Sequence, residues 1–129
     1  MNRDRLLAAA RIAAGLVFVV FGVAKFTSHE HEVASFRQYG LPEPDTTVYL
    51  IGVLEVGGGL LLLVGLLTRL VALALAGNMA VAIVVSGIKE GEVVPSLTLA
   101  PALLLIMLAL LRFGPGVPSL DARRAGAPA

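Results

Sequence analysis

Hydrophobic residues run with few breaks through four stretches of the chain, which short polar segments separate. The stretches cover residues 6–26, 47–67, 70–88 and 95–113. A hydrocarbon core of about 30 Å needs about 20 helical residues, and the first three stretches have that length. The uninterrupted apolar run of the fourth, about Ser96 to Leu111, is shorter, and it crosses only if its helix begins at Pro95 and ends at Phe113. A kink is expected at Pro101, about two turns inside. The pattern therefore predicts an all-α integral membrane protein, an antiparallel four-helix bundle.

The connections between these stretches differ in length. Only Thr68 and Arg69 separate the second stretch from the third, so we expect these two helices to be antiparallel neighbours. In the longer segment 29–45, apolar side chains recur at helical spacing, namely Val33, Phe36 and Tyr39. This spacing predicts a short amphipathic helix at the outer membrane interface, between spans one and two. We expect one membrane domain over residues 1–113 and a loose cytoplasmic tail over residues 114–129.

The composition supports a membrane protein and excludes several kinds of chemistry. Of the 129 residues, 57% are hydrophobic and 15% are charged, and the mean hydropathy is +0.90. Soluble domains are typically about 45–50% apolar and about 25% charged. A net charge of +1 without a basic run argues against nucleic-acid binding. Because the chain has no cysteine, it cannot form disulfides, relay thiols or ligate iron–sulfur clusters, and we expect no intrinsic cofactor.

The two histidines lie in one short run, His29-Glu30-His31-Glu32. Side chains two residues apart on a helix point in different directions, so they would not converge on one metal ion. They also cannot clamp a haem between two facing helices. We therefore interpret the run as part of a solvated outer loop and predict no metal site.

The distribution of arginine and lysine predicts the orientation. With the N-terminus inside, most basic residues fall on the cytoplasmic side, namely Arg3, Arg5, Arg11, Arg69, Arg112, Arg123 and Arg124. Lys25, Arg37 and Lys89 fall outside. Both termini are thus expected in the cytoplasm. The first stretch is too long for the apolar region of a signal peptide, and Arg11 interrupts it, which favours a retained span.

The first span carries two cations on one face. Arg11, Gly15, Phe18, Gly22 and Lys25 follow one another at steps of four and three residues, which places them on the same side of a helix. Glycines let another backbone approach closely, so this face should meet the bundle interior. We expect Arg11 to form a structural ion pair. Lys25 either extends to the outer interface or faces the interior.

Glu55 lies near the middle of the second span, with Gly52, Gly58 and Gly59 on its face. A charged side chain at that depth costs about 2.5–3.5 kcal/mol unless it is paired or protonated. It is therefore either a structural hydrogen-bond or ion-pair partner, or part of a ligand or proton site. Asn78 in the third span lies at a similar depth. It either joins helices or shares a polar site with Glu55.

Several motifs together resemble one family. The first span has Arg11, Gly15 and Lys25, and a Gly40-Leu41-Pro42 turn follows. The second span has Glu-x-Gly-Gly-x-Leu-Leu-Leu and runs into Gly-Leu-Leu-Thr-Arg, over residues 55–69. The tail has Gly-Pro-Gly and then Ser-Leu-Asp, over residues 114–121. In these features the chain resembles the DoxX family of small four-span bacterial membrane proteins.

The resemblance implies a multi-pass protein of the bacterial plasma membrane. Some relatives are named for a subunit of a thiosulfate:quinone oxidoreductase. Others associate with a superoxide dismutase and a sulfurtransferase in a membrane oxidoreductase complex. Since this chain lacks cysteine, direct thiol catalysis is out of reach, and contact with a membrane quinone or anchoring of a partner is left.

We therefore predict a membrane subunit of a redox complex, which depends on a soluble oxidoreductase or another membrane subunit for catalysis. Glu55, Arg11, Lys25 and Asn78 are the candidates for a ligand or proton site, and no catalytic residue is assigned. Two alternatives stay open. One is a scaffold or assembly factor without enzymatic activity. The other is a small proton-coupled transporter, for which a homo-oligomer would have to supply a second half.

Overall fold

The structure is a computed structural model that describes residues 2–91 and 98–126, and within these residues it contains helices and no strand. The elements in chain order are α1 (Arg3–Thr27), α2 (His29–Gln38), α3 (Pro44–Val64), α4 (Thr68–Ala82), η1 (Ile83–Ile88), α5 (Leu99–Phe113) and α6 (Leu120–Arg124). The π-helical turn η1 continues α4 without a break. The predicted all-α bundle is confirmed.

Three of the described helices are long and apolar enough to cross a membrane: α1, α3 and the continuous helix Thr68–Ile88. At 1.5 Å per residue, the last two are each about 31 Å long. The apolar helix α5 has 15 residues, a rise of about 22 Å. The expected start of this span at Pro95 lies outside the described residues. Pro101 is in the first turn of α5 rather than two turns inside, so its missing N–H removes no helical hydrogen bond there.

Helix α3 ends before the second apolar stretch does. Helix α3 ends at Val64, three residues before the predicted boundary, because Gly65 adopts a left-handed conformation with φ of 70°. The Gly65 N–H donates to the Leu62 carbonyl and the Leu66 N–H donates to the Leu61 carbonyl. This glycine cap stops the helix while the apolar sequence continues.

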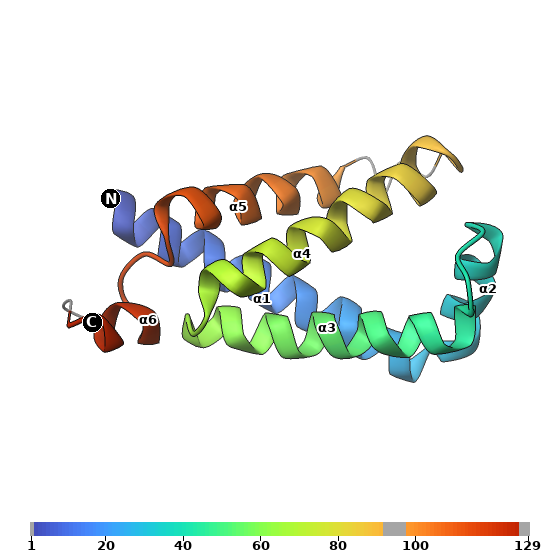
Figure 1. The fold of residues 1–129 in the computed structure, drawn as a ribbon, viewed down its shortest axis with the longest axis horizontal. Helices are drawn as coiled ribbons and strands as arrows, with labels where there is room; N and C mark the ends of the chain where they lie inside the picture. Colours follow the sequence, from blue (N-terminus) through green and yellow to red (C-terminus); the bar gives the residue numbers. More distant parts are fainter. Residues whose placement is uncertain (1, 92–97, 127–129) are drawn as a thin grey trace.

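The helices pack as two pairs, α1 with α3 and α4 with α5 (Figure 1). Glycines bring α1 and α3 into backbone contact: a Cβ atom on Gly59 would lie 2.7 Å from the Gly15 carbonyl oxygen. Between the pairs lies a core of fully buried side chains that includes Phe18, Leu75 and Met107. The predicted interior face of the first span is confirmed, since all five of its residues are buried.

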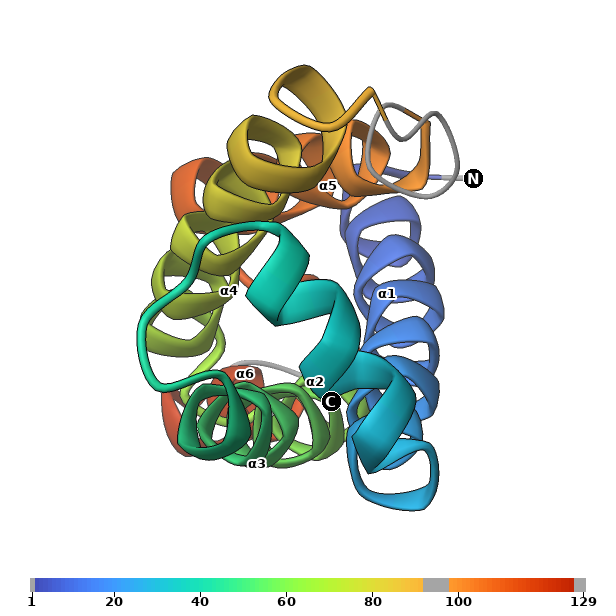
Figure 2. The same ribbon diagram turned by 90° about the vertical axis from the view of Figure 1, so that its right-hand side faces the viewer.

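The predicted short helix between spans one and two is present as α2. Figure 2, viewed from the end of the molecule that carries α2, shows this helix lying across that end of the bundle. Three contacts attach it there: Glu32 to Lys25 on α1, His29 to Asp45 on α3, and the Tyr39 carbonyl to the Lys89 ammonium after η1. The bundle is therefore covered at this end, which we call the α2 end.

The C-terminal segment, through residue 126, is not a loose tail, and that expectation is wrong. It docks on the opposite end of the bundle, where the N-terminus also lies (Figure 1). The Val117 N–H donates to the Asp4 carbonyl, and the Asp121 N–H donates to the Gly65 carbonyl. The Asp121 carboxylate accepts from the Leu67 and Thr68 N–H groups at 2.9 and 2.8 Å. These bonds satisfy backbone donors at the start of α4 that no helical carbonyl can reach.

Candidate functional site

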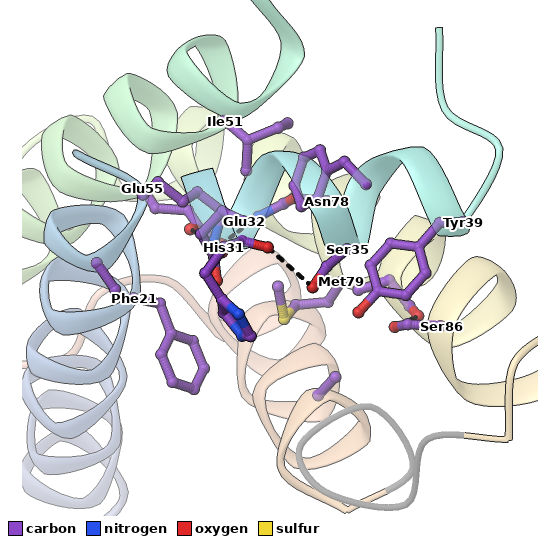
Figure 3. Close-up of a pocket in the computed structure, with 15 residues that line it drawn as sticks. Phe21, His31, Glu32, Ser35, Tyr39, Ile51, Glu55, Asn78, Met79 and Ser86 are labelled. Carbon is purple, nitrogen blue, oxygen red and sulfur yellow. Dashed lines mark hydrogen bonds and ion pairs between the residues drawn. The ribbon is translucent and has the colours of Figure 1, made fainter. Parts of the chain in front are cut away.

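A cavity of about 420 Å³ lies between the two helix pairs, beneath α2 (Figure 3). Its volume falls within the range of about 300–1,000 Å³ that is usual for small-molecule sites. Side chains from six elements line it: Phe21, Ala24 and Lys25 of α1; His31, Glu32, Ser35 and Phe36 of α2, with Tyr39 at its end; Ile51 and Glu55 of α3; Asn78, Met79 and Ala82 of α4; Ser86 of η1; and Ala100 of α5. Eight of these fifteen residues carry a polar side chain, although most of the exposed wall area of the cavity is apolar.

The structure brings three of the four candidate residues together on one wall of this cavity. Glu55, which is 3% exposed, places Oε1 2.7 Å from the Lys25 Nζ atom. Its Oε2 accepts a hydrogen bond of 2.9 Å from the Asn78 Nδ2 atom. Lys25 faces the interior and does not extend to the outer interface. One carboxylate therefore joins α1, α3 and α4.

Small residues make this approach possible. Gly52 lies one turn before Glu55 on the same face of α3, and a Cβ atom there would lie 3.1 Å from Lys25 Cβ. A Cβ atom on Gly22 would lie 2.7 Å from the Val56 backbone nitrogen. Because neither glycine has a side chain, α1 and α3 come close together. The Lys25 side chain is therefore long enough to contact the Glu55 carboxylate, which lies one turn beyond Gly52 on α3.

The two oxygens of Glu55 are not equally satisfied. Asn78 hydrogen-bonds to Oε2, whereas Oε1 has the Lys25 ammonium as an ion-pair contact but no hydrogen-bond donor in line with it. Lys25 Nζ is also 3.5 Å from Oε1 of Glu32 on α2. Two carboxylates therefore share one ammonium at the cavity wall. An oxygen that is buried and incompletely hydrogen-bonded can accept a further donor from a ligand or water.

The fourth candidate, Arg11, does not belong to this cluster. It is 1% exposed and lies at the opposite end of α1. Its Nε atom donates to the Leu62 carbonyl at 2.7 Å and its Nη1 atom to the Pro115 carbonyl at 2.6 Å. It forms no ion pair with a carboxylate among the residues described, so the expected ion pair is wrong. Backbone carbonyls satisfy this guanidinium, and in doing so they hold the C-terminal segment against α1 and α3.

The histidine run is helical rather than part of a loop. His29 Nε2 is 2.6 Å from Asp45 Oδ1, and its ring stacks on Tyr49 with centroids 3.9 Å apart. The hydrogen bond with Asp45 raises the pKa of His29. In the described part of the chain, no group of three or more histidine, aspartate or glutamate side chains could hold a metal ion. The pair instead connects the starts of α2 and α3.

Sequence reasoning missed the contribution of α2 to the cavity. Glu32, Ser35 and Tyr39 all line it, and Figure 3 shows these side chains beside Asn78 and Ser86. The three residues stand at steps of three and four, which places them on one helical face. That spacing could have indicated a polar face turned inward. The sequence analysis instead placed Glu32 in a solvated loop and Tyr39 on the apolar face of an interfacial helix.

Comparison with known proteins gives the family. The DoxX family model matches residues 6–87, which is more than half of the chain and includes Lys25, Glu55 and Asn78. A Bacillus subtilis (strain 168) protein named "Putative oxidoreductase CatD" is 34% identical over 79 residues. The match covers 61% of this chain and 58% of that relative, so the chain spans less than two thirds of the relative's length. No solved structure matches this chain. The helical membrane bundle and the family match over α1 to η1 together show that this chain is a membrane protein of the DoxX family.

Proposed function

We propose that this protein is the membrane subunit of a redox complex and that its cavity holds the head group of a membrane quinone. One observation carries the proposal: the Lys25–Glu55–Asn78 cluster lies on the wall of a mostly apolar cavity inside a membrane bundle. Apolar walls with a few convergent polar groups are typical of a small-molecule site. The Bacillus subtilis relative is named a putative oxidoreductase, and this name also supports a redox role.

The cluster has the groups that quinone reduction needs. A quinone carbonyl accepts hydrogen bonds, which the Lys25 ammonium and the Asn78 amide can donate. Reduction to the quinol takes up two electrons and two protons. Glu55 would pass the protons, because a carboxyl group within hydrogen-bond reach can act as acid and base. The electrons would come from a soluble oxidoreductase or another membrane subunit bound to this chain.

We place the complex in the bacterial plasma membrane with both termini in the cytoplasm. The end that carries the two termini also carries most of the arginines, which the positive-inside rule assigns to the cytoplasmic side. A soluble partner in the cytoplasm would then approach the end with α6, and the cavity would lie nearer the outer face.

The test is purification in a mild detergent followed by mass spectrometry of bound quinones and proteins. We expect a quinone in the wild type, its loss from Glu55→Gln, and its retention in Glu30→Gln. Glu30 is an exposed carboxylate on α2 that does not line the cavity, so it controls for the charge change. A wild-type preparation without quinone, which also fails to bind added quinone, would refute the proposal.

A second candidate is a scaffold without catalytic activity. It is favoured by the way the polar groups engage one another, since Lys25, Glu55 and Asn78 connect three helices without a ligand. Growth of a deletion strain that carries Glu55→Gln separates the two. A stable Glu55→Gln protein that restores growth fully supports the scaffold, whereas a stable protein that restores none supports the quinone site.

A further inference from the structure

A second, apolar chamber adjoins the polar cavity. It has a volume of about 120 Å³, and it shares six lining residues with the larger cavity: Phe36, Tyr39, Ile51, Asn78, Ala82 and Ser86. Asn78 therefore stands where the two spaces meet, with its amide bonded to Glu55 on the polar side. A molecule bound across this junction would have its polar end at the cluster and its apolar end in the second chamber.

The residues that line only the second chamber come from the entry into α3 and the far end of the α4–η1 helix. They are Leu41, Thr47, Val81 and Val85. The Thr47 hydroxyl donates to the Pro42 carbonyl at 2.6 Å, so the threonine is satisfied internally. Val81 lines the chamber and is also 50% exposed. The chamber thus reaches the outer surface of the bundle between α3 and α4, which faces hydrocarbon in a membrane protein.

Helix α2 lies across the end of the bundle beside the cavity (Figure 2). The helix is attached on three sides, by Glu32 to Lys25 at 3.5 Å, by His29 to Asp45 at 2.6 Å, and by the Lys89 ammonium to the Tyr39 carbonyl at 3.0 Å. A molecule from the bilayer meets none of these contacts at Val81. The lateral side at Val81 is therefore a way into the chamber that crosses none of the contacts holding α2.

The charges at the cavity wall select the kind of head group. Glu55 and Glu32 share Lys25 between them, so the ammonium is already neutralised and a carboxylate nearby stays uncompensated. An anionic head, such as that of a fatty acid, would be repelled by the second carboxylate. A neutral head with hydrogen-bond acceptors meets donors without this penalty.

We infer that the apolar chamber is a binding site for the hydrocarbon chain of a neutral amphiphile, which enters laterally from the bilayer between α3 and α4. The inference rests on the proposed function for the head group, and it adds that a chain attached to the quinone is required for tight binding. The first part of the chain fills the chamber. The remainder leaves past Val81 into the lipid.

The test compares three probes in nanodiscs: a quinone without a side chain, the same quinone with a ten-carbon chain, and a neutral ten-carbon alkyl ketone. Val85→Phe fills the chamber. The matched control is Val84→Phe, the same change at an adjacent residue that is 55% exposed and lines neither space. We expect Val85→Phe to weaken binding of the long-chain quinone about tenfold, because overpacking excludes the chain, and to leave the chainless quinone unchanged. Val84→Phe should change neither.

The outcomes separate the inference from the proposed function. If both quinones bind the wild type equally and Val85→Phe affects neither, the chain site is refuted and the head-group site stands. If no quinone binds but the alkyl ketone binds and is lost in Val85→Phe, the quinone function is refuted and the chamber stands. If no probe binds, both are refuted. Melting temperatures of the two variants check that each remains folded.

Discussion

Lys25 on α1 and Glu55 on α3 form an ion pair of 2.7 Å between two helices that glycines bring into backbone contact, and the side chains of Lys25 and Glu55 are only 11% and 3% exposed. The pair is asymmetric. Lys25 has a second carboxylate, Glu32, at 3.5 Å, whereas Oε1 of Glu55 has only the lysine. Loss of the cation should therefore harm the protein more than loss of the carboxylate.

A double-mutant cycle measures this asymmetry. Lys25→Met leaves Glu55 buried beside a single amide donor and should cost about 3–5 kcal/mol of unfolding free energy. Glu55→Gln should cost less, about 2 kcal/mol, since Glu32 still balances the lysine and glutamine still accepts a hydrogen bond. The double variant should recover part of the loss. Unfolding in detergent measures all four proteins, and strictly additive losses would show that the ion pair contributes no coupling.

Three consecutive glycines on α3 offer an internally controlled test of packing. A Cβ atom on Gly59 meets backbone atoms at 2.7 and 2.9 Å, whereas on Gly58 it meets the ends of Leu75 and Val71 at 3.2 and 3.3 Å. On Gly57 it meets nothing within 4 Å. Gly59→Ala should cost about 3 kcal/mol, because two helix backbones must separate. Gly58→Ala should cost under about 1 kcal/mol, and Gly57→Ala should stabilise by about 0.5–1 kcal/mol.

We therefore expect the highest melting temperature for Gly57→Ala, a lower one for Gly58→Ala and the lowest for Gly59→Ala. Equal melting temperatures for the last two would contradict the backbone contact between α1 and α3. The face with Gly52, Gly58 and Gly59 packs against α1 and α4.

Asp121 should stabilise the start of α4 from a distance of more than 50 residues in sequence. Asp121→Ala removes the acceptors for two backbone N–H groups and should cost about 1–2 kcal/mol. Asp121→Asn keeps one acceptor oxygen and should cost less. Arg123→Ala, an exposed change on the same short helix, serves as the control. A similar loss in Arg123→Ala would show that the effect belongs to α6 and not to the cap.

The same residue predicts a pH dependence. Burial tends to raise the pKa of Asp121, but hydrogen bonds from Thr68 and Leu67 outweigh it, so the pKa is lowered from 3.8. A lowered folded-state pKa adds stability above the ordinary value, and this is lost as the pH falls through the folded-state value. Acid unfolding of the wild type should thus include a component that is missing from Asp121→Asn. Identical acid transitions would contradict it.

His29 predicts the opposite dependence. Its pKa is raised, mainly by the hydrogen bond with Asp45, so the charged form is favoured in the folded protein. The added stability is complete below the ordinary pKa of about 6.5 and is lost as the pH rises through the folded-state value. Melting temperature should therefore fall on going from about pH 6 to pH 8. Asp45→Asn should flatten this slope, and an unchanged slope would assign it to another group.

The proposed orientation can be tested because the chain has no cysteine of its own. Single cysteines at Gln38 and Glu90, both exposed at the α2 end, should react with an impermeant reagent in intact cells. A cysteine at Ala125 should react only after the membrane is opened. Labelling of Ala125 in sealed cells would reverse the topology and would place the cavity toward the cytoplasm.

The sequence alone determined the long helices and the inward face of α1. Hydropathy identified the three long helices, and the spacing of Gly15, Gly22 and Lys25 identified the side of α1 that is buried. Both signals are local, since each depends on residues within a few turns of one helix. For the same reason Glu55 could be identified as costly and buried before any partner was known.

The tertiary structure decided which groups meet. Nothing in the local sequence of Arg11 shows that its partners are the carbonyls of Leu62 and Pro115, because backbone acceptors leave no trace in side-chain pattern. The same applies to the docked C-terminal segment, whose glycines, prolines and charged residues suggested a loose tail. The cavity itself depends on how α2 folds over two helix pairs. The cavity forms where segments distant in sequence pack together. The hydropathy and periodicity of a single segment do not encode that packing.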